Sequence, residues 1–129
     1  MKRKYLDEIN VTERPDLWEI DDKHKMAKWE KQREEIGFDD RELWSLDYTF
    51  LLWLYERLVR FKDVVDNFVD LSYWKFNYLN KEYTQEELIN LMIGKLELYF
   101  SNNLEHIERI KCSKEIAEIW AIVLPVMWY

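Results

Sequence analysis

One segment in the middle of the chain is apolar at nearly every turn of a predicted helix. Its apolar residues recur three and four positions apart, and residues 50–55 are all apolar or aromatic. A helix that is apolar around its whole circumference is covered by neighbours on several sides, so we place these aromatic side chains in the core. Asp39 suits an N-cap, and Glu42 follows at capping-box spacing. The pattern predicts one capped helix over residues 37–62.

A second helix is predicted over residues 16–35. A thin apolar stripe runs through this mostly charged segment, which is typical of a helix that docks by a narrow seam. Asp16 can cap its start. Gly37 suits a left-handed cap after its end.

The remainder of the chain carries further helical patterns. Thr84 and Glu87 form a capping box ahead of apolar residues at helical spacing up to residue 100. The same spacing returns after residue 104. Ser113 is a candidate cap for a break between two segments, and Pro125 should kink or end the last helix because it lacks a backbone donor.

Residues 73–84 alternate aromatic and polar side chains around Leu79 and Asn80. Such alternation is compatible with a short β-hairpin, in which Asn80 tolerates positive φ in the turn. A two-stranded ribbon is marginal alone and would have to lie on helices. The pattern leaves open whether this hairpin forms.

Length and composition bound the fold. The chain has 129 residues, 48% of them apolar, with only two glycines and two prolines. Few breakers favour long helices, and the length fits one domain with its own core. We therefore expect a mainly α-helical bundle of four or five helices over residues 1–129, with the hairpin as its one β element. Residues 1–15 end at Pro15 and are expected to form an N-terminal arm.

Charge and apolar runs narrow the class of partner. The formal net charge of −7 argues against nucleic-acid binding, which depends on neutralising phosphates. The longest apolar run, residues 119–129, is shorter than the roughly 20 residues of a membrane span. The basic first residues are not followed by an apolar stretch, so no signal peptide is expected. These features predict a cytoplasmic protein without a membrane partner.

Side chains that could support catalysis or metal binding are sparse. His24 and His106 lack the Glu-x-x-His context of di-iron bundles, and His24 stands among lysines that repel cations. Cys112 has lysines nearby that could lower its pKa, but no base partner is evident. The chain has no nucleophile elbow, phosphate loop or zinc cluster. We expect no catalytic residue, no metal site and no cofactor.

Aromatic residues carry most of the functional interest. Seven Trp, eight Tyr and six Phe include several that stand in polar or irregular contexts. Trp and Tyr are preferred interface anchors and also stack on nucleobases. The candidates for an exposed binding surface are Trp18, Trp29, Trp74 and Tyr78.

Three residues of the central segment could form a small polar site. On a continuous helix Asp40, Trp44 and Asp47 share one face, which would place carboxylates beside an aromatic wall. The alternative is structural, with Asp39 and Asp40 capping the helix while Asp47 pairs with a basic residue of a neighbouring helix.

The apolar C-terminal run predicts a contact. An apolar terminus is buried either within the fold or across a subunit interface. The two alternatives stay open, and the candidate residues for a homodimer interface are Trp120, Met127 and Trp128.

The motif Gly-Phe-Asp-Asp-x-x-x-Trp-Ser-Leu-Asp over residues 37–47, with the apolar helix after it, resembles small proteins encoded by bacteriophages and prophages of Gram-positive bacteria. Residues 86–100 and 120–128 extend the resemblance to about half the chain. It implies a helical fold and a phage origin, and it transfers no catalytic residue.

The combined features predict a non-catalytic phage accessory protein. It would act in the cytoplasm of a host bacterial cell, binding and modulating a host factor such as a defence component, or binding another phage protein. The alternatives are a nucleotide-binding sponge, with an aromatic and basic pocket near Trp29 or Trp74, and a structural phage protein.

Overall fold

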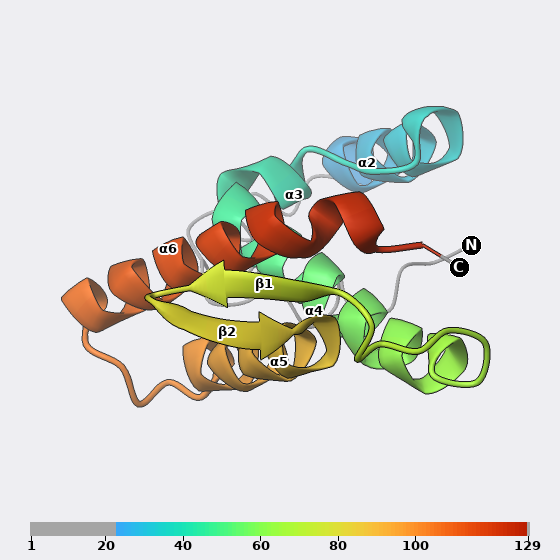
Figure 1. Ribbon diagram of the computed structural model, residues 1–129. Coiled ribbons are helices and arrows are strands. Elements are labelled where there is room, and N and C mark those ends of the chain that lie inside the picture. The colour runs from blue at the N-terminus through green and yellow to red at the C-terminus, as the bar shows by residue number, and fades with distance from the viewer. Residues whose placement is uncertain (1–22, 129) are drawn as a thin grey trace. The chain divides into compact units, whose positions relative to one another are not determined.

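Figure 1 shows a computed structural model of the chain, in which residues 23–128 are described. The chain divides into two compact units, residues 1–54 and 55–129, and each is taken by itself. The division falls inside one helix, α4. Within the described residues there are five α-helices, a short 3-10 helix and a two-stranded antiparallel hairpin. The predicted mainly α-helical fold with one hairpin is confirmed.

The first described helix, α2, spans Lys23–Ile36. It confirms the later part of the predicted helix over residues 16–35, whereas Asp16 lies outside the described residues. Gly37 has φ 85° and its N–H donates to the Arg33 carbonyl at 3.1 Å. The left-handed cap predicted at Gly37 is therefore present, in a conformation that glycine adopts without steric cost.

The single helix predicted over residues 37–62 is wrong, because it is divided in two. Helix α3 spans only Arg41–Trp44, and α4 spans Leu46–Val65. Between them Ser45 leaves the helical region, with φ −137° and ψ 67°. Serine competes for local hydrogen bonds and is a weak helix former, which a hydrophobic pattern does not register. Residues before and after Ser45 therefore do not share a helix face.

The apolar stretch at residues 50–55 is not covered on all sides. Leu51 and Leu54 are buried, but Phe50 and Trp53 are 45% and 37% exposed. Placing these two aromatic side chains in the core was wrong. The helix α4 is amphipathic there in spite of its uniform composition, and it leaves one aromatic face open.

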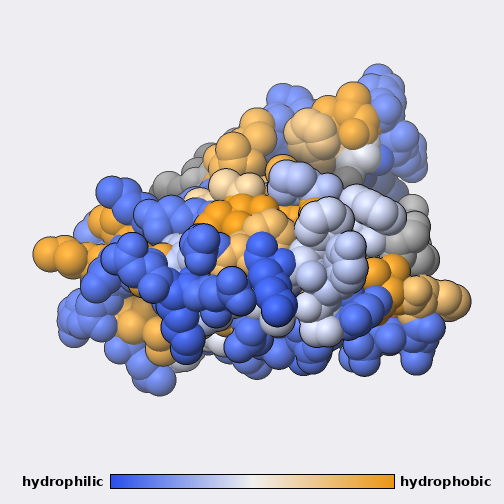
Figure 2. Space-filling view, in the orientation of Figure 1, coloured by the Kyte–Doolittle hydropathy of each residue, from blue (hydrophilic) through white to orange (hydrophobic). Residues whose placement is uncertain are grey.

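The hairpin predicted around residues 73–84 is confirmed. Strand β1 spans Lys75–Tyr78 and β2 spans Lys81–Thr84, and the two pair antiparallel. Leu79 and Asn80 form the turn with φ 52° and 62°. Positive φ at both central residues is typical of the type I′ turn that suits a two-residue hairpin. In the second unit the hairpin lies beside α5 (Figure 1). The face of the molecule shown in Figure 2 is mostly hydrophilic around the hairpin, with apolar side chains between.

Helix α5 spans Gln85–Phe100 and begins with the predicted capping box. Thr84 Oγ1 accepts from the Glu87 N–H at 3.1 Å, and Glu87 Oε1 accepts from the Thr84 N–H at 2.9 Å. Two otherwise unpaired donors of the first turn are satisfied in this way.

Helix α6 spans His106–Val123 and packs against α5. The break predicted at Ser113 is wrong. Ser113 Oγ donates to the Ile110 carbonyl at 2.8 Å, so the hydroxyl is satisfied inside a continuous helix. Pro125 does end the helix, and Leu124–Val126 form the 3-10 helix η3. The apolar side chains of α5 and α6 that are fully buried are Leu88, Ile89, Met92, Leu96, Ile116, Ile119 and Val123.

The C-terminal run is partly buried within the second unit. The buried Gln85 amide donates to the Val126 carbonyl at 3.2 Å. Trp120 and Met127 are half-buried, whereas Trp128 is 63% exposed. The run therefore begins buried within the fold and ends exposed, and a subunit contact stays a prediction.

Leu79 offers a test of the turn geometry. A leucine at positive φ is disfavoured by contact between its Cβ and the backbone, and this side chain is 75% exposed, so little burial is lost on replacing it. We expect Leu79→Asn to raise the free energy of unfolding by about 1 kcal/mol, measured by urea denaturation. The control is Glu82→Asn in β2, where asparagine is disfavoured. A loss of stability in both variants would contradict the turn assignment.

Candidate functional site

Asp39 is the electrostatic centre of the first unit. Its side chain is fully buried, and its Oδ2 accepts from Arg33 Nη1 at 2.6 Å and from Arg41 Nη2 at 2.9 Å. Oδ1 accepts from Arg41 Nε at 3.1 Å and from the Arg41 N–H at 2.9 Å. A buried carboxylate is tolerated when it is paired and its lone pairs are used, as they are here. The three residues Arg33, Asp39 and Arg41 are called the ion triad below.

Opposing effects act on the pKa of Asp39. Burial alone would raise the pKa of this carboxyl. Hydrogen bonds from Arg41 and Arg33, together with the charge of Arg41, outweigh burial and hold the pKa below its usual value. Asp39 therefore remains ionised in the folded protein at neutral pH.

The predicted capping box at Asp39 is half formed. Glu42 is buried and its Oε2 accepts from the Asp39 N–H at 3.3 Å. The Asp39 side chain accepts from the Arg41 N–H, one residue short of the partner that the box requires. Asp40 occupies the N-cap position without a side-chain capping bond. Its carboxylate instead lies 3.8 Å from Lys28 Nζ.

Trp29 packs against the ion triad. The Arg41 guanidinium carbon lies 4.8 Å from the centre of the Trp29 ring, a cation–π arrangement, and Trp29 is buried. The prediction that Trp29 offers an exposed binding surface is wrong. The charged residues around Trp29 in the sequence suggested an exposed position, but Trp29 contacts Arg41, twelve positions later.

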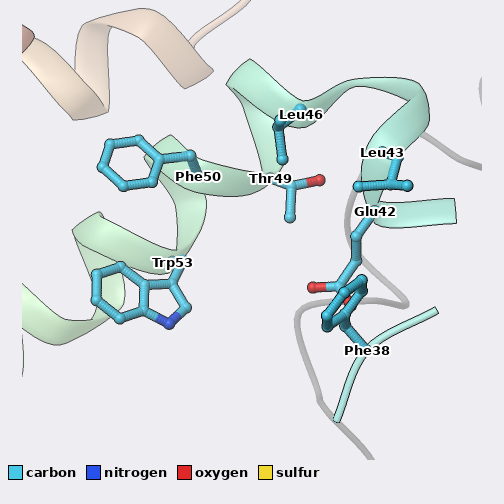
Figure 3. Close-up of a pocket in the computed structure, with 7 residues that line it drawn as sticks. All are labelled: Phe38, Glu42, Leu43, Leu46, Thr49, Phe50 and Trp53. Atoms are coloured by element: carbon cyan, nitrogen blue, oxygen red, sulfur yellow. The ribbon is translucent and has the colours of Figure 1, made fainter. Parts of the chain in front are cut away.

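The first unit also contains an apolar pocket of 350 Å³ (Figure 3). It is lined by Phe38, Glu42, Leu43, Leu46, Thr49, Phe50 and Trp53. Phe50 and Trp53 are stacked on one side, with ring centres 6.2 Å apart and planes 15° apart. Glu42 and Phe38 lie across from them in the close-up. Pockets of this size that combine apolar walls with a few polar groups are typical ligand sites.

Thr49 places an unsatisfied hydroxyl at this pocket. The residue is 6% exposed, and Thr49 Oγ1 is buried without a hydrogen-bond partner. A buried donor and acceptor left unpaired costs on the order of 1–3 kcal/mol, so such a group in a folded protein calls for an explanation. A ligand that hydrogen-bonds this hydroxyl would remove that cost.

The polar site predicted from Asp40, Trp44 and Asp47 is not assembled as expected. Asp40 precedes α3, Trp44 is the last residue of α3, and Asp47 is an exposed residue of α4 beyond the break at Ser45. Trp18 lies outside the described residues.

Sequence reasoning missed the residues that line the pocket. Leu46, Phe50 and Trp53 recur at i, i+4 and i+7 on one face of α4, a spacing that the uniform apolar run around them hid. Thr49 carried no signal of its own, because a threonine on a helix is ordinary.

In the second unit the aromatic candidates differ from one another. Trp74 is exposed as predicted and meets Tyr73 edge to face at 5.3 Å. Tyr78 is buried, contrary to prediction, because alternation along β1 turns it inward. Burial raises the pKa of Tyr78, with a further contribution from the Glu118 carboxylate, and its hydroxyl has no hydrogen-bond partner.

Cys112 is a buried thiol whose Sγ donates to the Lys95 carbonyl at 3.2 Å. Burial raises the pKa of Cys112, although Lys95 acts in the opposite direction. Lys95 itself is paired with Glu115. A protonated, buried thiol is a poor nucleophile, which fits a structural role for this residue.

Among residues 23–128, no three His, Cys, Asp or Glu side chains are grouped so that they could hold a metal ion. No helix in this part of the chain combines the length and apolar character needed to cross a membrane. No protein-family model, curated protein or solved structure matches the chain.

The ion triad predicts a pH-dependent stability. A carboxyl whose pKa is lowered on folding stabilises the folded state above its unfolded pKa of about 3.9, and this contribution is lost as the pH falls through the folded value. We expect Asp39→Asn to lower the free energy of unfolding by about 3 kcal/mol at pH 7, because two partly buried guanidinium groups lose their charged partner.

The difference between the wild type and Asp39→Asn should shrink below about pH 4, as urea denaturation across the pH range would show. The exposed Asp66 provides a control, and Asp66→Asn should be close to neutral. A difference that is constant with pH would contradict the stabilising role of the Asp39 charge.

Proposed function

We propose that this protein is a non-catalytic binding protein whose pocket at residues 38–53 receives an apolar anchor from a partner protein. The observation that supports it is the pocket itself, in which Phe50 and Trp53 are partly exposed beside the unpaired hydroxyl of Thr49. Large aromatic side chains around a preformed pocket are the usual core of a binding hot spot.

The charge near the pocket favours a basic partner segment. Residues 38–53 contain four acidic side chains, Asp39, Asp40, Glu42 and Asp47, against the single basic Arg41. Asp39 is neutralised within the ion triad. The Asp40 side chain is 43% exposed with Lys28 Nζ 3.8 Å away, and Asp47 is an exposed residue of α4. Charge complementarity steers encounter and selects partners, so the anchor is expected to be flanked by Lys or Arg.

The biological setting is part of the same proposal. The resemblance of residues 37–47 to phage and prophage proteins supports a phage accessory protein that binds a host factor and modulates it, for example in counter-defence. The nucleotide-sponge alternative loses one of its two aromatic platforms, because Trp29 is buried beneath Arg41.

Selection from a random peptide library displayed on phage would test the binding function. We expect the wild-type protein to enrich peptides that carry one apolar or aromatic anchor beside basic residues. Phe50→Asp should weaken the binding of a selected synthetic peptide at least tenfold, because a charge replaces part of the apolar wall. Fluorescence polarisation with the labelled peptide measures this change.

The matched control is Phe68→Asp, which changes an exposed phenylalanine of the second unit and should leave the affinity unchanged. Circular dichroism of both variants checks that they are folded, and Leu46→Asn replaces Phe50→Asp if the latter unfolds. Absence of any enriched peptide whose binding depends on this pocket, together with thermal stabilisation by nucleotides, would overturn the proposal in favour of the sponge.

We further propose that the exposed end of the chain joins two copies. Leu124 and Trp128 belong to an apolar run, and both are more than half exposed. Large exposed apolar side chains are frequent at subunit contacts. We expect native mass spectrometry to show a dimer that Trp128→Glu converts to a monomer. Ile107→Glu, which changes another exposed apolar residue on α6, is the control. A monomeric wild type at tens of micromolar would refute this interface.

A further inference from the structure

The Thr49 hydroxyl suggests the chemistry of the anchor. Its own backbone N–H donates to the Ser45 carbonyl at 2.9 Å, so the helix continues normally at this residue. Helical threonines often use the hydroxyl on the carbonyl four residues back, but Thr49 Oγ1 makes no hydrogen bond. Figure 3 shows this oxygen directed toward the side of the pocket where Leu43 and Glu42 lie.

The surroundings favour a donor over an acceptor at this hydroxyl. A threonine hydroxyl can play either part. Glu42 lines the same pocket, and its Oε2 is already an acceptor, for the Asp39 N–H. A second acceptor beside such oxygens is unfavourable, whereas an N–H or O–H is favourable. A ligand group that reaches Thr49 is therefore expected to donate.

The walls define the rest of the ligand. Apart from Glu42 and Thr49 the lining is entirely apolar, and the nearly parallel Phe50 and Trp53 rings offer flat aromatic surface. The volume of 350 Å³ lies at the small end of ligand pockets, which suits one aromatic anchor and not an extended ligand. A bare ammonium or guanidinium would lose hydration against such walls.

We propose that the pocket selects a flat aromatic group bearing one hydrogen-bond donor, such as the indole of a partner tryptophan, and that Thr49 Oγ1 accepts its hydrogen bond. This inference rests on the proposed function and specifies the anchor. An indole combines a large apolar face with a single N–H, which is why tryptophan serves so often as an interface anchor.

A comparison of two ligands on two proteins tests the hydrogen bond. Indole and benzothiophene have nearly the same shape, but only indole has an N–H. NMR titration of wild-type protein should give an affinity for indole about fivefold higher than for benzothiophene. Thr49→Val keeps the shape of the side chain and removes the hydroxyl. It should reduce the ratio to less than about twofold while benzothiophene binding is retained.

The control is Tyr78→Phe, which removes a second buried and unpaired hydroxyl, in the other unit, and should leave the ratio unchanged. Thr49→Val should also raise the melting temperature, since an unsatisfied group is removed from the interior. That gain alone would also follow from a purely structural role, so the ligand ratio is the decisive readout.

Several outcomes would overturn the inference. Equal affinities for the two ligands in the wild type, equal losses of both in Thr49→Val, or tighter binding of quinoline, which only accepts, would each do so. Binding of neither ligand would also count against it. Indole selectivity without any pocket-dependent peptide would leave the inference standing and refute the partner-protein function. Selected peptides that bind this pocket without an aromatic donor would refute the inference and leave the partner-protein function standing.

Discussion

The buried carboxylate of Asp39 is the constraint on which the first unit depends. It joins Arg33 near the end of α2 to Arg41 at the start of α3, across the turn made by Gly37. Breaking such a pair leaves unpaired charge in a region of low polarity, so the turn has few alternative conformations. Phe38 and Glu42 flank this carboxylate in the chain, and both line the pocket. The same short segment thus carries the ion-paired Asp39 and two residues of the pocket lining.

The pocket and the ion triad are formed by different residues, several of which belong to the same short segment. Asp39 and Arg41 turn their polar atoms toward each other, and the Arg41 guanidinium lies over the Trp29 ring. Neither Asp39 nor Arg41 lines the pocket. Leu46, Phe50 and Trp53 use the face of α4 that its buried residues Leu51 and Leu54 leave open. An apolar pocket whose neighbouring residues are held by ion pairs is the arrangement expected of a preorganised binding site.

Local chemistry in the sequence predicted the second unit well and the first unit poorly. The Thr84 cap, the turn at Asn80 and the stop at Pro125 each depend on neighbours within a few residues, so the sequence pattern contains what decides them. The break at Ser45 and the burial of Trp29 depend on contacts that periodicity does not encode. For the candidate site, the sequence pointed to Asp40, Trp44 and Asp47, and none of these three residues lines the pocket. Two residues of the pocket, Phe50 and Trp53, belong to the apolar run that had been assigned to the core.

The burial of Cys112 has a practical consequence for spectroscopy. It is the only cysteine in the chain, and its buried thiol with a raised pKa reacts slowly with alkylating dyes at neutral pH. A cysteine introduced at an exposed position would therefore take up a fluorophore or spin label selectively without removal of the native one. Pairs of such labels, one in each unit, would give distances across α4 in solution by energy transfer or electron resonance.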